Sequence, residues 1–117
     1  MRIRFVRLKK SELVREAIED RMAPLLKKYK GVNEKDVFIE VEMENSPHQA
    51  GRDLFRLKFN IKEGELRGFI LEKSDINFYR ALSSLANSLP ANINRFRARR
   101  DRKSYNRIRK LKTAAGI

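Results

Sequence analysis

The chain lacks the residues on which several classes of protein depend. Its 117 residues include no cysteine and no tryptophan, and the only histidine is His48. Without cysteine there are no disulfides, thiol nucleophiles or thiolate zinc ligands, and one histidine does not build a histidine-based metal site alone. No apolar run approaches the roughly 20 residues that span a bilayer, and residues 1–5 alternate between charged and apolar instead of forming the apolar run of a signal peptide. We therefore expect a cytoplasmic protein with no membrane contact, metal or other cofactor.

Recognisable catalytic sets are also missing from the sequence. The five glycines are scattered, so they form no phosphate-binding loop, and His48 sits in a polar stretch without the serine and aspartate pattern of a triad. Glu40, Glu42 and Glu44 share one face of a predicted strand, which suits either a cation site or a solvated sheet face. We favour the solvated face, because oxygen-rich cation sites usually gather their ligands from a tight loop. These features predict a protein that is not an enzyme and has no small-molecule substrate.

Positive charge is what the chain has in excess. Its 28 lysines and arginines outnumber 15 acidic residues, for a net charge of +13. Residues 94–117 hold ten basic residues and one aspartate, giving +9, whereas residues 1–10 carry +5 and residues 30–50 carry −3. A field of this kind attracts polyanions and speeds their encounter with the protein. The charge therefore predicts a basic patch with a basic tail, and a nucleic acid as the partner.

Periodicity predicts four strands and two helices. Alternation of apolar and polar residues indicates strands at residues 2–8, 36–44, 54–62 and 65–72. Helical spacing indicates one helix from Ser11, a good N-cap, to about Tyr29, and a second one capped by Ser74, Asp75 or Asn77. The apolar stripe predicted for the second helix comprises Tyr79, Leu82, Leu85, Leu89, Ile93 and Phe96.

Prolines and turn residues mark the expected interruptions. Pro24 predicts a kink or break in the first helix and Pro90 a bend in the second, because proline removes a backbone donor and clashes with the preceding turn. Residues 45–51 predict a loop, and Glu63 with Gly64 predicts a tight hairpin between the last two strands.

The element order β-α-β-β-β-α defines the expected architecture. Three consecutive strands form an antiparallel meander, and the first strand, which precedes a helical crossover, pairs in parallel with one of them. Each strand is apolar on one face only, so both helices pack on that face of a four-stranded mixed sheet in a two-layer α+β sandwich. We expect a domain at residues 1–97 and a basic helical extension or disordered tail at residues 98–117.

The densest charge lies at the end of the second helix. Six cations fall within nine residues, and we call them the arginine segment: Arg95, Arg97, Arg99, Arg100, Arg102 and Lys103. Like charges at this density destabilise an isolated helix unless phosphate neutralises them, and the arginine fork matches phosphate oxygens. A solvated tail without a partner is one alternative. Binding to an anionic membrane is another, although the +9 segment lacks the wide apolar face that this needs.

Several short motifs resemble one known family. Residues 11–16 (Ser-Glu-Leu-Val-Arg-Glu) are similar to its opening of the first helix, and residues 21–29 resemble the close of that helix. Residues 64–67 look like its turn into the fourth strand, and residues 79–93 resemble the tyrosine and leucine spacing of its second helix. In order and spacing together, these motifs resemble the ribosome hibernation-promoting factor family, also called ribosome-associated inhibitor A or ribosomal subunit interface proteins.

The resemblance implies a function and a set of contacts. Members bind the small ribosomal subunit in the channel used by messenger and transfer RNA, and basic side chains on both helices contact ribosomal RNA. Pro24, Ser88 and Ala91 replace basic residues of the family, so we expect RNA contacts to move toward the arginine segment. The protein is expected to be a monomer when free, and a binder of other structured, double-stranded RNA is the alternative. The predicted RNA-binding residues are Arg21, Lys27, Lys28, Lys30, Arg80 and the six of the arginine segment.

Overall fold

A computed structural model describes residues 1–29, 31–44 and 54–114, with side chains described through residue 103. The strands and helices follow the predicted order β-α-β-β-β-α, with one additional turn of 3-10 helix. They are β1 (Arg2–Val6), α1 (Glu12–Leu26), η1 (Glu34–Asp36), β2 (Val37–Glu44), β3 (Leu54–Ile61), β4 (Ile70–Asp75) and α2 (Phe78–Ala114).

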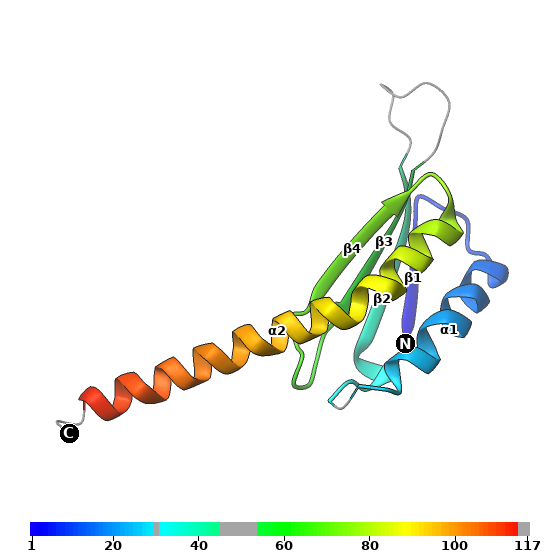
Figure 1. Cartoon of the computed structure of the whole chain (residues 1–117). Helices are drawn as coiled ribbons and strands as arrows, with labels where there is room; N and C mark the ends of the chain where they lie inside the picture. The colour runs from blue at the N-terminus through cyan, green and yellow to red at the C-terminus, as the bar shows by residue number, and fades with distance from the viewer. Residues whose placement is uncertain (30, 45–53, 115–117) are drawn as a thin grey trace.

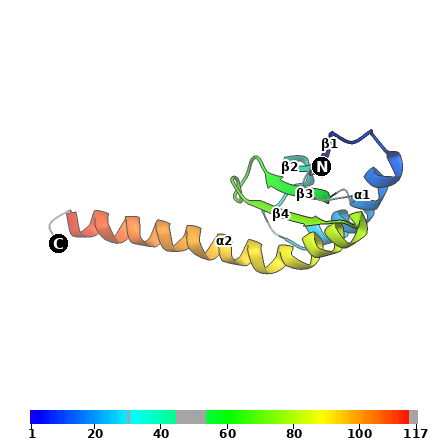
Figure 2. The same cartoon turned by 90° about the horizontal axis from the view of Figure 1, so that it is seen from above.

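The strands form one mixed sheet in the order β1-β2-β3-β4. β1 runs parallel to β2, and the β2–β3 and β3–β4 pairs are antiparallel, as the crossover and the meander predicted. Both helices cover the same face of this sheet and leave the other face open (Figures 1 and 2). The α+β two-layer sandwich predicted from the sequence is therefore confirmed.

The core lies between the sheet and the helix layer. Alternate residues of β2 and β3 point into it, because successive side chains of a strand lie on opposite faces. Every described residue that is buried is apolar. The fully buried side chains of the central strands are Val37, Ile39, Val41, Leu57, Phe59 and Ile61, and those facing them from the helices are Ile18, Met22, Leu26, Leu85, Leu89 and Ile93.

The fourth strand begins five residues later than predicted, so the prediction of residues 65–72 was wrong. Residues 62–69 instead form a turn, in which Gly64 and Gly68 adopt φ values of 89° and 93°. These left-handed conformations suit glycine, which has no Cβ to clash. The Gly68 amide donates to the Ile61 carbonyl at 3.0 Å. The predicted two-residue hairpin is replaced by this longer turn, which brings Leu66 into the core.

Both helices have the predicted kind of N-cap, and neither is ended by its proline. Ser11 Oγ accepts a hydrogen bond from the Val14 amide at 3.4 Å, as predicted. Asn77 caps α2, with its Oδ1 2.9 Å from the Tyr79 amide. α1 continues through Pro24 but ends at Leu26, three residues before the predicted end, and α2 continues through Pro90.

One predicted member of the core stripe lies at the surface. Tyr79 is 65% exposed, whereas its neighbour Phe78 is 8% exposed and packs against Phe55. The rest of the stripe, from Leu82 onward, faces the sheet as predicted. Phe78 and Tyr79 differ by only about 100° around the helix, so the sequence did not distinguish which ring begins the stripe.

Candidate nucleic-acid interface

Helix α2 extends well past the sheet on which it packs. Ile93 is its last fully buried residue, and Phe96 is half-buried with its ring 5.6 Å from that of Phe69. The helix then continues to Ala114 and gives the molecule extents of 65 × 34 × 20 Å (Figure 1). We call residues 97–114 the projecting helix. Its 18 residues correspond to a length of about 27 Å. It stands away from both layers of the domain (Figure 2).

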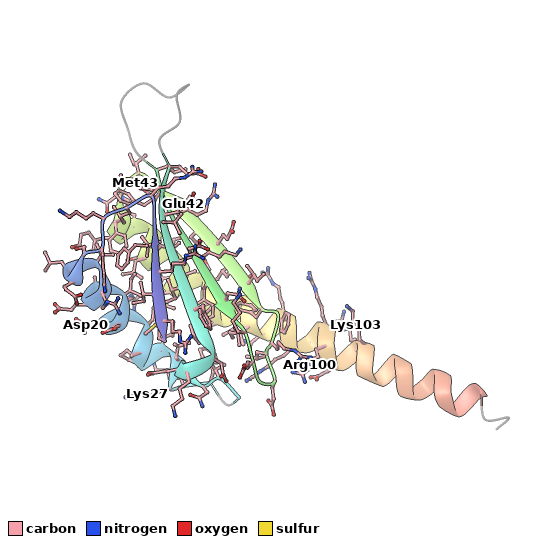
Figure 3. All side chains as sticks on the ribbon, turned by 180° about the vertical axis from the view of Figure 1, so that it is seen from behind. Asp20, Lys27, Glu42, Met43, Arg100 and Lys103 are labelled. Atoms are coloured by element: carbon pink, nitrogen blue, oxygen red, sulfur yellow. The ribbon has the colours of Figure 1, made fainter. Side chains whose placement is uncertain are left out.

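The arginine segment lies where the projecting helix begins. Five of its members are exposed and Arg97 is half-buried. Successive residues of a helix turn by about 100°, so these six positions are distributed around the helix instead of lining one face. Arg100 and Lys103 continue the stripe that faces the sheet up to Phe96, at a point where the sheet has ended (Figure 3). The cations therefore cover about 220° of the helix circumference, with Ala98 and Asp101 in the remaining sector, which suits a partner that receives the helix in a groove.

The helix layer above the sheet is much less basic. The exposed residues of α1 include the acidic side chains Glu12, Glu16 and Asp20, and the exposed residues of α2 between Arg80 and Arg95 are neutral. Arg21 lies where the helices meet, with its Nη2 donating to Asn87 Oδ1 at 3.1 Å. The positive charges of the two helices are therefore concentrated beyond the end of the sheet, and not on the part of the helix layer that covers the sheet.

The other predicted residues fall at two ends of the domain. Lys27 and Lys28 are exposed just after α1, and Lys27 lines an open hollow of about 590 Å³ together with Glu34 and Glu65. Lys27 and Arg100 lie toward the same end of the sheet (Figure 3). Arg80 is exposed in the first turn of α2, about 22 Å along the helix axis from Arg95. Lys30 lies outside the described residues.

Sequence reasoning did not identify the basic residues on the open face of the sheet. Arg2 and Arg4 lie on β1, Lys58 lies on β3 and Lys62 directly follows it. They gather around the half-buried ring of Phe38 on β2, with Arg2 and Lys62 over the ring itself. Two features of the sequence did indicate these basic residues: the +5 charge of residues 1–10 and the alternation of cations along β3. The pairing of these strands, which brings the two sets together, was not readable from either segment alone.

Two of the three glutamates of β2, Glu42 and Glu44, are engaged in ion pairs. Arg56 reaches Glu44 at 2.6 Å and Glu42 at 3.7 Å, and Arg7 lies 3.8 Å from Glu42. Among the described residues, no three histidine, cysteine or acidic side chains are grouped as metal ligands. His48 lies outside the described residues, as does the predicted loop at 45–51. In the part of the chain described, no helix combines the length and apolar character needed to cross a bilayer.

Comparison with known proteins supports the fold. No protein-family model matches the chain, and a search of curated proteins finds no significant match. The N-terminal domain of Thermus thermophilus protein Y is similar, with a TM-score of 0.51 and 17% identity over 82% of this chain and 99% of that one. A ribosomal subunit interface protein from Coxiella burnetii aligns with a TM-score of 0.49 and 13% identity over 84% of this chain and 99% of that one. The chain thus has the fold that its resemblance to the ribosome hibernation-promoting factor family predicted.

Proposed function

We propose that this protein is a ribosome-binding hibernation factor. It lays the arginine segment on ribosomal RNA of the small subunit and blocks the channel used by messenger and transfer RNA. The observation that carries the proposal is the position of the arginine segment, at the start of a helix that projects beyond the domain. The fold adds support, because members of the family that the chain resembles bind the small subunit with this architecture.

The energetics of the projecting helix favour an anionic partner. Within the arginine segment, five pairs of cations stand three or four residues apart: 95/99, 97/100, 99/102, 99/103 and 100/103. Each like-charge pair at this spacing costs a few tenths of a kcal/mol, so together they destabilise the helix by about 1 to 2 kcal/mol. Residues 98–103 are exposed and have no packing to offset this repulsion. RNA phosphates neutralise the charges and allow bidentate arginine contacts, which strengthen both the helix and the complex.

The mechanism we propose is steric and needs no catalytic group. Residues 1–97 act as the ribosome-binding domain, and residues 98–117 act as the basic extension that contacts RNA. Arg21, Lys27, Lys28 and Lys30 would contact RNA from the α1 side, and Arg80 from the opposite end of α2. A protein bound in this way occupies the space of messenger and transfer RNA, acts as a monomer in the cytoplasm, and silences the ribosome while it stays bound.

Sedimentation with ribosomes tests the proposal. Purified protein is centrifuged through a gradient with whole ribosomes, and with separated subunits, at low and moderate salt. We expect it to travel with the small subunit and with whole ribosomes at close to one copy each, and to inhibit translation in a cell-free assay. Protein that stays at the top of the gradient at both salts contradicts the proposal. If such protein still binds duplex RNA, the alternative of a binder of other structured RNA stands.

A further inference from the structure

The open face of the sheet is divided into two regions of different charge balance. At one end, Glu42 and Glu44 are neutralised by Arg56 and Arg7 in the ion pairs described above. At the other end, Arg2, Phe38 and Asn60 form one cross-strand row, and Arg4, Glu40 and Lys58 form the next. Lys62 follows immediately after β3. None of the ion pairs among the described residues involves Arg2, Arg4, Lys58 or Lys62.

An aromatic ring lies at the centre of this basic end. Phe38 is half-buried on the open face, with Arg2 Cζ 5.5 Å and Lys62 Nζ 5.6 Å from its ring centroid. These cations approach from the two sides, because β1 and β3 flank β2. Exposed cation–π contacts are weak, so a ligand can displace them.

A small hollow adjoins the ring. It has a volume of about 130 Å³, and its lining includes Arg4, Phe38, Lys58, Asn60 and Lys62. Complete small-molecule sites usually measure about 300 to 1,000 Å³, so this hollow suits a single flat group and not a whole cofactor. Four cations, Arg2, Arg4, Lys58 and Lys62, outnumber the three carboxylates at this end, Glu40, Glu72 and Asp36, so the net charge favours an anionic chain.

We propose that the basic end of the open sheet face binds an unpaired base of single-stranded RNA, with the base stacked on Phe38. Arg2 and Lys62 turn from the ring to the flanking phosphates, and the Asn60 amide faces the base edge. Aromatic rings on a sheet surface stack RNA bases, and basic side chains around them hold the backbone. This inference rests on the proposed RNA-binding function, but it assigns a second contact surface, on the face opposite the helices.

The position of this surface allows one RNA to reach both contacts. The row of Arg2, Phe38 and Asn60 continues to Ile70 on β4, directly after Phe69. Phe69 packs against Phe96, the residue at which α2 leaves the core. The projecting helix and the basic end of the sheet therefore meet at the same end of the domain (Figure 3).

A tryptophan probe at position 38 tests the inference directly. The chain contains no tryptophan, so the Phe38→Trp variant carries a single indole, at the site itself. We expect saturable quenching of its fluorescence by a short unstructured RNA, and no quenching by an abasic RNA backbone of the same length. The matched control is Leu13→Trp, at a residue that is 76% exposed at the acidic start of α1, and it should not be quenched.

A second variant measures the contribution to affinity. Phe38→Leu keeps an apolar side chain and every cation but removes the ring, and should weaken binding of single-stranded RNA about tenfold. Circular dichroism establishes that the variant is folded. If labelled RNA binds but the indole at position 38 is not quenched, or Phe38→Leu binds as tightly as the parent, this inference is overturned and the proposed function stands. If neither ribosomes nor any RNA binds, both fail.

Discussion

Removing three charges from the projecting helix should change how RNA binding depends on salt. Arg99, Arg100 and Arg102 are exposed and lie beyond the last core contact of α2. Each phosphate contact steepens the slope of log affinity against log salt by about 0.7 for single strands and about 0.9 for duplexes. If all three residues contact phosphates, the Arg99→Ala/Arg100→Ala/Arg102→Ala variant should have a slope shallower by about 2 to 3 units.

This difference is large enough to measure in a binding titration. Between about 50 and 200 mM salt, the variant should lose about 20- to 40-fold less affinity than the parent protein. Labelled protein is titrated with small ribosomal subunits by fluorescence anisotropy at several salt concentrations, with magnesium held constant. Alanine has the highest helix propensity, the three side chains have no core packing, and their removal relieves all five like-charge pairs, so the variant should unfold at a temperature no lower than that of the parent.

A charge-matched variant separates local contact from net charge. Lys9→Ala/Lys10→Ala/Lys35→Ala removes the same three positive charges from exposed positions outside α1 and α2. It should keep a slope close to that of the parent, apart from a small uniform loss of affinity. The reasoning is refuted if the arginine variant retains the parent slope. It is also refuted if the two triple variants have equally reduced slopes, because attraction would then follow net charge and not the arginine segment.

Three further predictions concern stability and are measured by chemical or thermal denaturation followed by circular dichroism. Leu89 is fully buried, so Leu89→Ala should lower the free energy of unfolding by about 2 to 5 kcal/mol, whereas Leu13→Ala, at a residue 76% exposed, should change it by less than about 0.5 kcal/mol. Asn77 accepts hydrogen bonds from two amides of α2 at 2.9 and 3.3 Å, so Asn77→Ala should cost about 1 kcal/mol and more than Ser11→Ala, whose single bond measures 3.4 Å. Pro90→Ala should raise the melting temperature, because it restores a helical donor within an uninterrupted helix, and a lower value would contradict this account of the proline.

The features that the sequence predicted correctly are those governed by local energetics. The alternation in β2 and β3 has one arrangement that buries Val37, Ile39 and Val41, since shifting a strand by one residue would expose them all. The parallel pairing of β1 follows from the helical crossover, and Ser11 was recognisable as a cap because its side chain bonds within its own helix. The concentration of charge near the C-terminus is likewise a property of one continuous segment.

The features that the sequence did not predict depend on the backbone path and on strand pairing. Leu66 and Phe69 stand three residues apart, a spacing that does not place them on one face of a strand and does not identify a turn. Two left-handed glycines bring both into the core from a turn. The sequence did not predict that each helix would continue past its proline. Packing of the helix against the sheet compensates for the lost backbone hydrogen bond, and this packing belongs to the tertiary structure.

The basic end of the open sheet face is the clearest case of a feature that arises from tertiary structure. Arg2, Phe38 and Lys62 are separated by 24 or more positions in the chain, and each is an ordinary outward residue of its own segment. Their proximity follows from the register that pairs Arg2 with Phe38 and Phe38 with Asn60. That register is selected by burial of the opposite, apolar face of the sheet. Local residue patterns therefore set the elements and the charge of each segment, while burial of the shared core set which charges came together.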